Sequence, residues 1–220
     1  MAREPGISLN LWRQQLGTVP DSVWDQIELD SLILAENGLQ EVSERLGRLT
    51  KLQTLDLGHN KLSRIPESIG ELVDLAGFLY LHDNSLSSLP ASLERLTKLR
   101  YLNISENQFA ELPGVVCDLV GLVELRATDN HLTRLPDSIG RLCRLRELHL
   151  RNNGLQSVPS SVGELHELRL IDLRGNPLTQ LPEAIASLPR LDKLDLRWVT
   201  TLPWPAWISN LEARGCAVYR

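Results

Sequence analysis

The sequence predicts an α/β solenoid, a right-handed curved horseshoe with one parallel β-sheet on its concave side and short helices or 3-10 turns on its convex side. Leucines in the stretch 52–75 follow the spacing L-x-x-L-x-L-x-x-N-x-L. An asparagine also recurs at one position of this frame, in steps of 23, 24, 23, 23, 23 and 23 residues. Such a period indicates a stack of similar units along the whole chain. The recurring asparagines are Asn37, Asn60, Asn84, Asn107, Asn130, Asn153 and Asn176.

Each repeat is expected to contribute one strand and one turn. Side chains alternate along a strand, so Leu55 and Leu57 should point into the core while Asp56 points outward. A short turn that begins at a proline should follow and carry Ile69 and Leu72 inward from the convex side. One unit cannot bury these side chains alone, so the core forms only when neighbouring units stack.

The asparagine column is interpreted as structural. A buried amide can donate to and accept from backbone groups at the point where each strand bends away. Replacing Asn107 by alanine is therefore expected to cost about 1 to 3 kcal/mol through unsatisfied backbone groups. The frame extends by one step to Gln14 and to Val199, which is typical of imperfect terminal repeats.

The unbroken period predicts a single domain over residues 1–220. Residues 1–8 are expected to be a lead-in, and residues 9–203 to hold about eight repeats plus a terminal strand unit. Residues 204–220 are expected to form a helical cap, because a proline lies near the start of this segment and a glycine follows its apolar stretch.

Three local departures from the repeat carry expectations of their own. Val23, Trp24 and Ile27 should cover the open N-terminal end of the core. Ser43 stands where most repeats have proline, which favours a looser turn. The single 24-residue step arises from one additional residue in the segment 75–79, and a bulge or loop before the next strand should keep that strand in register.

Composition and charge narrow the choice of partner and compartment. The net charge of -5 and the isoelectric point near 5.6 argue against nucleic acid or an anionic membrane as a general partner. The sequence has no apolar run of membrane-spanning length and no hydrophobic signal core near residue 1. Cys117, Cys143 and Cys216 lack C-x-x-C spacing, which predicts buried or half-buried free thiols. We therefore expect a cytoplasmic monomer without a cofactor.

One predicted binding surface, here called the aromatic patch, lies on the concave sheet. Outward positions of successive strands form columns about 4.8 Å apart, which gathers most of the chain's phenylalanines and tyrosines. Exposed aromatic residues ringed by charge are typical of protein-binding hot spots. Cross-strand packing that only stabilises the sheet is the alternative interpretation. The patch comprises Phe78, Tyr80, His82 and Tyr101, with Asp56, His59, Asp83 and Glu106 nearby.

A second group on the same face is here called the arginine column. Exposed ion pairs between neighbouring strands, each worth under about 1 kcal/mol, explain it without any partner. Alternatively, its guanidinium groups bind an acidic or phosphorylated partner. The column comprises Arg126, Arg151, Arg174 and Arg197, beside Glu124, Glu147, Asp172 and Asp195.

Catalytic groups are poorly represented in the sequence. His149 and Asp172 are neighbours in one column and could pair, but the nearest concave serine, Ser105, lies two strands from His149, about 9.6 Å away by the column spacing. The sequence has no nucleophile elbow and no phosphate-binding loop. One further group could approach a metal ion but lacks a fixed ligand spacing, so no metal site is predicted. Its members are His59, His82 and Asp83.

The motif L-P-x-x-I-G-x-L-x-x-L at residues 135–145 has near copies in most units. With it, the chain resembles the 23-residue intracellular leucine-rich repeats of the Ras-group scaffolds and of many bacterial repeat proteins. The resemblance covers nearly the whole chain and implies the leucine-rich repeat solenoid and a role in protein–protein interaction, often in signalling. The matching residues belong to the core, so they do not identify a partner. The sequence differs from many relatives in lacking an accompanying kinase, GTPase or ubiquitin-ligase domain.

The leading hypothesis is a non-enzymatic scaffold that binds another protein on its concave face, in intracellular signalling or regulation. One alternative is a small-ligand receptor or an enzyme that uses His149, Asp172 and the arginine column. A further alternative is an effector that is delivered into a host cell and targets a host protein.

Overall fold

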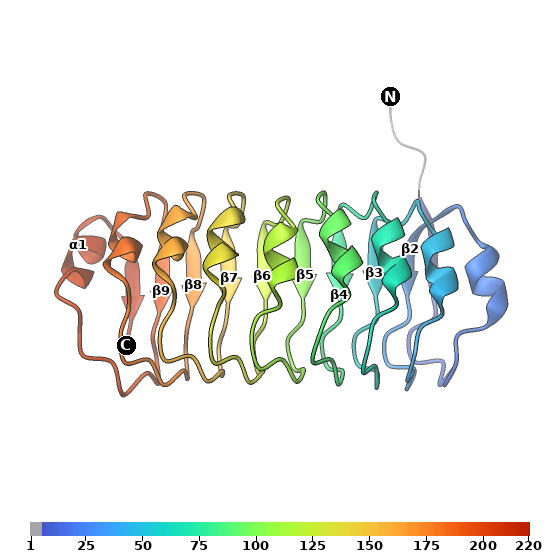
Figure 1. Cartoon of the computed structure of the whole chain (residues 1–220), viewed down its shortest axis with the longest axis horizontal. Coiled ribbons are helices and arrows are strands. Elements are labelled where there is room, and N and C mark those ends of the chain that lie inside the picture. The colour runs from blue at the N-terminus through green and yellow to red at the C-terminus, as the bar shows by residue number, and fades with distance from the viewer. Residues whose placement is uncertain (1–5) are drawn as a thin grey trace, which may run out of the picture.

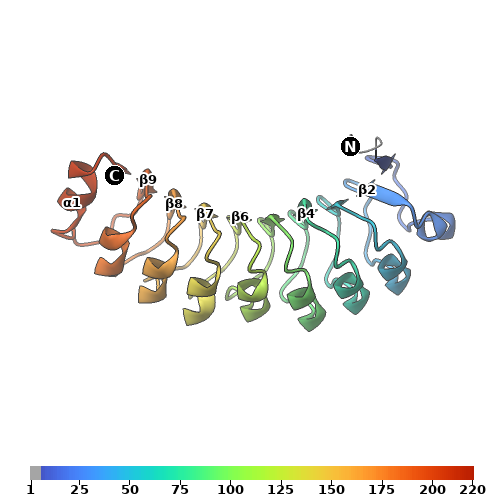
Figure 2. The ribbon, with the colours of Figure 1, turned by 90° about the horizontal axis from the view of Figure 1, so that it is seen from above.

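The computed structural model describes residues 6–220, and in this range ten strands form one parallel sheet in chain order (Figure 1). Seen from above, the strands lie along the inner side of an arc and the turns along its outer side (Figure 2). The predicted α/β horseshoe is therefore confirmed. The strands are β1 (Ile7–Asn10), β2 (Leu29–Ile33), β3 (Thr54–Asp56), β4 (Phe78–Tyr80), β5 (Tyr101–Asn103), β6 (Glu124–Arg126), β7 (Glu147–His149), β8 (Leu170–Asp172), β9 (Lys193–Asp195) and β10 (Ala217–Tyr219).

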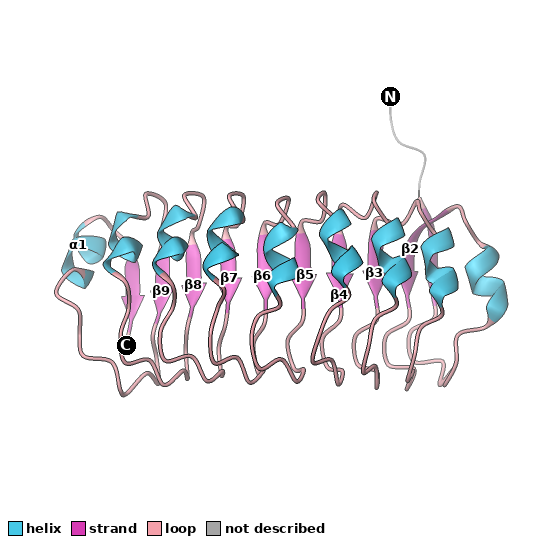
Figure 3. Ribbon diagram, viewed as in Figure 1, coloured by secondary structure: helices cyan, strands magenta, loops and turns pink. Residues whose placement is uncertain are grey.

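Short 3-10 turns cover the convex side, and one α-helix follows them near the C-terminus (Figure 3). A proline precedes every one of these turns except η2, because its fixed φ suits the extended residue before a turn. The elements are η1 (Asp21–Asp25), η2 (Glu44–Arg48), η3 (Glu67–Glu71), η4 (Ala91–Arg95), η5 (Gly114–Asp118), η6 (Asp137–Arg141), η7 (Ser160–Glu164), η8 (Glu183–Ser187) and α1 (Ile208–Ala213).

The turn η2 is as long as its neighbours although it follows Ser43 rather than proline. The Ser43 hydroxyl oxygen accepts a hydrogen bond from the backbone N–H of Arg45 at 3.2 Å, so the side chain caps the turn. The expectation of a looser turn at this position is wrong, because capping replaces the conformational restriction that proline supplies elsewhere.

Leucine, isoleucine and valine side chains from strands and turns form one continuous core. Trp24 is 1% exposed and closes the N-terminal end as expected, but Ile27 is 47% exposed and does not cover the core. Ile27 lies just beyond η1, where the chain already returns toward β2. In the longer repeat, Leu79 still pairs with Leu55, so the additional residue is absorbed before β4 and the register is kept.

The asparagine amides connect each repeat to the one before it. Asn107, which is 2% exposed, donates from Nδ2 to the carbonyl oxygens of Leu81, Ile104 and Ser105 at 3.0 to 3.2 Å. Its Oδ1 accepts from the backbone N–H of Leu86 at 2.9 Å. This geometry confirms the structural role predicted for the column, since one amide satisfies backbone groups of two repeats.

The residue before each asparagine slot adopts a left-handed backbone conformation. Its φ is 53° at His59, 50° at Asp83, 55° at Glu106 and 64° at Trp198. A glycine supplies the same geometry at Gly175, with a φ of 67°. The leucine spacing alone does not predict this conformation, although His, Asp and Asn, which tolerate positive φ better than most residues, recur at the position.

The C-terminal cap packs as predicted against the last repeat. Ile208 and Leu211 of α1 are fully buried, and β10 pairs in parallel with β9. Gly215, with a φ of 90°, turns the chain between helix and strand. The core is thereby closed at its C-terminal end.

The cysteines only partly follow the expectation of buried or half-buried thiols. Cys117 and Cys216 are buried, but Cys143 is exposed, because it follows the inward-pointing Leu142 and faces outward after η6. All three are free. None of the helices in residues 6–220 combines the length and apolar character that crossing a membrane requires.

Candidate functional site

Strand register assembles the aromatic patch. Phe78 on β4 pairs with Tyr101 on β5, and Tyr80 pairs with Asp56 on β3 and with Asn103 on β5. These pairs place the three aromatic side chains in adjacent outward columns, as the sequence predicted. Phe78 is 46% exposed, and both tyrosines are half-buried.

The aromatic rings contact one another in an unbroken group. The centroid of Tyr101 lies 5.0 Å from that of Tyr80 and 5.4 Å from that of Phe78, while Phe78 and Tyr80 stack at 6.0 Å. Such distances are typical of favourable aromatic pairs. The rings therefore stabilise each other across the strands and also present a rigid apolar surface, so both interpretations made from the sequence describe part of the geometry.

Burial raises the pKa of both tyrosines of the patch. It raises the pKa of Tyr101 to about 12, and burial together with the Asp56 carboxylate raises the pKa of Tyr80. Both phenols are neutral hydrogen-bond donors near pH 7, as a tyrosine of ordinary pKa also is, and they stay neutral to higher pH. A cleft of about 250 Å³ lies beside them, lined in part by Phe78, Tyr101 and Glu124.

Two histidines extend the patch toward the asparagine loops. The ring of His82 meets Tyr80 edge-on at 6.0 Å and His59 edge-on at 4.5 Å. His59 Nδ1 lies 2.6 Å from Asp83 Oδ2, and its Nε2 lies 3.1 Å from His82 Nε2. The structure thus brings together the three residues that the sequence analysis considered, and rejected, as a metal site.

Gly58 explains why His82 lies where it does. A Cβ at this glycine would overlap the His82 ring, so the absence of a side chain lets the imidazole pack on β3. Burial there, and the neighbouring His59, lower the pKa of His82. The Nδ1 atom of His82 is buried without a hydrogen-bond partner among the described residues. The charged residues Asp56, Asp83 and Glu106 are half-buried or exposed beside this group.

Three arginines of the column pair with the carboxylate two residues earlier in the same repeat, whereas Arg151 pairs with the preceding repeat and Arg174 also lies 3.7 Å from Asp195 of the next one. Arg174 donates to Asp172 at 2.5 and 2.8 Å, and Arg197 donates to Asp195 at 2.8 and 2.9 Å. Asp172 and Asp195 are 4% and 0% exposed, so these are not the exposed pairs that were expected. Each aspartate also accepts from the backbone N–H two residues later, which turns it toward the sheet.

Two further arginines of the column are also occupied. Arg126 Nε donates to Glu124 at 2.5 Å and Arg151 donates to Asp129 at 3.1 Å. The four column arginines therefore hold carboxylates of this chain, which weakens the hypothesis that they receive an acidic partner.

The predicted pairing of His149 with Asp172 does not form. His149 Nε2 instead lies 3.1 Å from Glu147 Oε2 and 3.8 Å from Glu124 Oε1, because both glutamates stand in the adjacent outward column. The potential ligand atoms of this group lie within 4.8 Å of one another. Arg126 already holds Glu124, which leaves Glu147 and His149 paired only with each other and with Glu124.

Comparison with known families decides the identity of the chain. Residues 27–76 and 78–132 match the family described as leucine rich repeat, and residues 137–213 match the leucine-rich repeat region family. The chain is a leucine-rich repeat protein. A search of curated proteins gives no match to it. Leucine-rich repeat domains generally act as non-enzymatic protein-interaction modules.

Solved structures share this leucine-rich repeat fold. A leucine-rich repeat protein of Leptospira interrogans is 26% identical with a TM-score of 0.74, over 93% of this chain and 64% of that one. The ectodomain of the Arabidopsis thaliana receptor kinase GASSHO1/SCHENGEN3, in complex with CASPARIAN STRIP INTEGRITY FACTOR 2, is 31% identical with a TM-score of 0.75, over 87% and 24%. The leucine-rich repeat domain of the type III effector XopL is 27% identical with a TM-score of 0.72, over 90% and 78%. The chain described here spans less than two thirds of the length of the Leptospira protein and of the receptor kinase ectodomain.

Proposed function

We propose that this chain is a scaffold that binds another protein on its concave face, in cytoplasmic signalling or regulation. The observation that carries the proposal is the contiguous surface of Phe78, Tyr80 and Tyr101, with ring centroids 5.0 to 6.0 Å apart and Phe78 46% exposed. Exposed, mutually packed aromatic rings lose little conformational entropy on binding and are enriched at interface hot spots. The related receptor kinase ectodomain was solved with a bound protein factor, which supports a protein as partner.

The carboxylates on the Tyr80 and His82 side of the patch favour a partner segment that carries arginine or lysine there. Asp56 and Glu124 act on Tyr80, and Asp83 and Glu106 act on His82, whereas Arg126 already lies over the ring of Tyr101. A cation over an aromatic face gains from the ring quadrupole, and nearby carboxylates add to that attraction. We therefore expect an apolar segment with one or two basic residues to occupy this surface.

Affinity capture from lysate of the source cell tests the proposal. Wild-type protein is compared with Tyr80→Ser/Tyr101→Ser, which removes the patch, and with Val73→Ser/Val120→Ser, which removes exposed apolar side chains outside it. All three must show the same unfolding midpoint in urea. We expect one partner to be retained by wild type and by the valine variant and to be lost by the tyrosine variant. Equal capture by all three proteins would refute a role for the patch.

The enzyme and small-ligand alternatives receive less support than the scaffold, because His149 contacts Glu147 and Asp172 contacts Arg174 instead of pairing with each other. A delivered effector is a second candidate, supported by the similarity to the leucine-rich repeat domain of XopL. A fusion to a translocation reporter tests it. Reporter signal inside host cells that depends on the bacterial secretion system would support this candidate, and signal without that dependence would reject it.

A further inference from the structure

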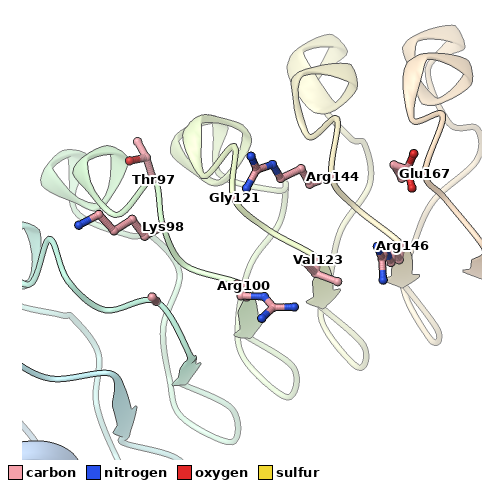
Figure 4. Close-up of a pocket in the computed structure, with 9 residues that line it drawn as sticks. Thr97, Lys98, Arg100, Gly121, Val123, Arg144, Arg146 and Glu167 are labelled. Atoms are coloured by element: carbon pink, nitrogen blue, oxygen red, sulfur yellow. The ribbon is translucent and has the colours of Figure 1, made fainter. Parts of the chain in front are cut away.

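A groove of about 740 Å³ lies on the flank of the solenoid where the concave strands begin (Figure 4). It is formed by the segments that lead from the turns η4, η5, η6 and η7 to the next strands. Lys98 and Arg100 form one wall, and Arg144 and Arg146 form the other. In Figure 4 the side chain of Arg144 reaches back over Gly121.

Three of the four cations in the groove walls have no carboxylate partner in the described part of the chain, and the fourth, Lys98, is paired with Asp74. Arg100, Arg144 and Arg146 are exposed, and none has a carboxylate within ion-pair distance among residues 6–220. Glu167 also lines the groove but is held by Arg190. Three unpaired guanidinium groups are unexpected in a chain of net charge -5, whose other concave and convex arginines mostly have carboxylate partners.

The middle repeat leaves the floor of the groove open. At the two positions where its neighbours carry long cations, it has Gly121 and Val123. A Cβ at Gly121 would overlap the carbonyl oxygen of Thr97, so the close packing of these two repeats requires glycine. The walls at Arg100 and Arg146 therefore stand two repeats apart, about 9.6 Å by the strand spacing.

We propose that this flank groove binds a phosphorylated segment of a partner protein. Guanidinium groups bind phosphate through paired, charge-assisted hydrogen bonds, and a phosphoserine carries about -1.5 to -2 charges at neutral pH. A peptide in the polyproline II conformation has three residues per turn and rises about 3.1 Å per residue, so phosphoserines three residues apart point to the same side and are separated by about 9.3 Å. That spacing matches the separation of the two arginine walls.

The shape and extent of the positive charge favour a short phosphopeptide over nucleic acid. Nucleic-acid binding surfaces neutralise a series of phosphates along an extended basic stripe. Here the unpaired arginines occupy one groove, and Arg126, Arg174 and Arg197 on the concave face are bound to carboxylates. The groove adjoins the aromatic patch, because Arg100 and Val123 line both this groove and the cleft beside Phe78 and Tyr101, but the phosphate proposal rests on the arginines and does not require the patch to bind a partner.

Fluorescence anisotropy with labelled peptides tests the proposal. The probe is a ten-residue peptide with two phosphoserines three residues apart, and its comparison peptides carry one phosphoserine or none. Protein variants are Arg100→Gln/Arg146→Gln and the charge-matched Arg48→Gln/Arg134→Gln, whose arginines are exposed and ion-paired outside the groove. A twelve-residue oligothymidylate serves as the nucleic-acid probe.

We expect wild type and the charge-matched variant to bind the doubly phosphorylated peptide saturably in 50 mM salt. The groove variant should bind at least tenfold more weakly, and the singly phosphorylated peptide should bind wild type more weakly than the double one. Three results would overturn the proposal: no saturable binding up to 1 mM peptide, equal losses in both variants, or groove-dependent binding of oligothymidylate that is tighter than that of the peptide.

Discussion

Substituting Asn107 by alanine removes one complete amide from the interior of the solenoid. The amide makes four hydrogen bonds with the backbone, three as donor and one as acceptor. The cost depends on which backbone groups keep another partner. The Leu81 carbonyl still accepts from Asn84 at 3.2 Å, and the Ile104 carbonyl from Asn130 at 3.0 Å.

The Ser105 carbonyl also keeps a donor, the backbone N–H of Asp83 at 3.0 Å. Only the N–H of Leu86 loses its acceptor altogether. One buried, unsatisfied donor costs about 1 to 3 kcal/mol, and the three weakened carbonyls add a smaller amount. We therefore expect Asn107→Ala to lower the free energy of unfolding by about 2 to 3 kcal/mol.

Urea unfolding followed by circular dichroism measures this loss, and hydrogen exchange at the Leu86 amide localises it. Asn107→Asp is the informative comparison, because a carboxylate can still accept from Leu86 but cannot donate to the carbonyls. Gln108→Ala, an exposed neighbour, controls for the loss of a polar side chain. A cost for Asn107→Ala within 0.5 kcal/mol of that for Gln108→Ala, on the order of an ordinary surface substitution, would refute the reasoning.

Three further predictions concern the concave face. Gly58→Ala should displace the His82 ring into solvent, raise its pKa toward the ordinary 6.5, and leave the fold intact, as an NMR titration of the ring proton would show. In wild type the folded protein takes up this proton at lower pH than the unfolded chain does. Stability should therefore be full above about pH 6.5 and decrease as the pH falls through the folded pKa of His82; pH-independent unfolding midpoints between 7.5 and 5 would contradict this. Burial alone would raise the pKa of Asp195, but hydrogen bonds from Arg197 lower it. Asp195→Asn should therefore lower the free energy of unfolding by about 1 to 3 kcal/mol at pH 7. The loss should become smaller in acid, as the wild-type carboxylate is protonated. An equal cost at pH 7 and pH 3 would exclude an ionic contribution.

The fold could be predicted from the sequence because the repeat period fixes the register. Once Asn60 and Asn84 occupy the same position, the outward column that contains Asp56 and Tyr80 follows by counting, and the strand pairs confirm it. The long repeat did not disturb this counting, since its additional residue lies before β4.

Side-chain partners were less predictable, because periodicity gives the position of a Cβ but not the direction of a long side chain. Arg174 makes its hydrogen bonds to Asp172, two residues earlier in its own repeat, and lies at a longer 3.7 Å from Asp195 of the next repeat. The flank arginines were missed for a related reason. Arg100 and Arg146 precede strands, outside the outward positions that were read for binding residues, although their alternation with Val123 is visible in the sequence.

The asparagine amides make the stabilisation of the repeats asymmetric along the solenoid axis. Each amide fastens the repeat that precedes it, as Asn107 does for Leu81 and Leu86, so every repeat depends on its C-terminal neighbour. Val199, in the last position of the frame, has no amide to offer the repeat of Asn176. The final full repeat is therefore retained mainly by α1 and β10. Local unfolding should begin at the C-terminal end and advance toward the N-terminus. The last 17 residues therefore protect all of the repeats from unfolding.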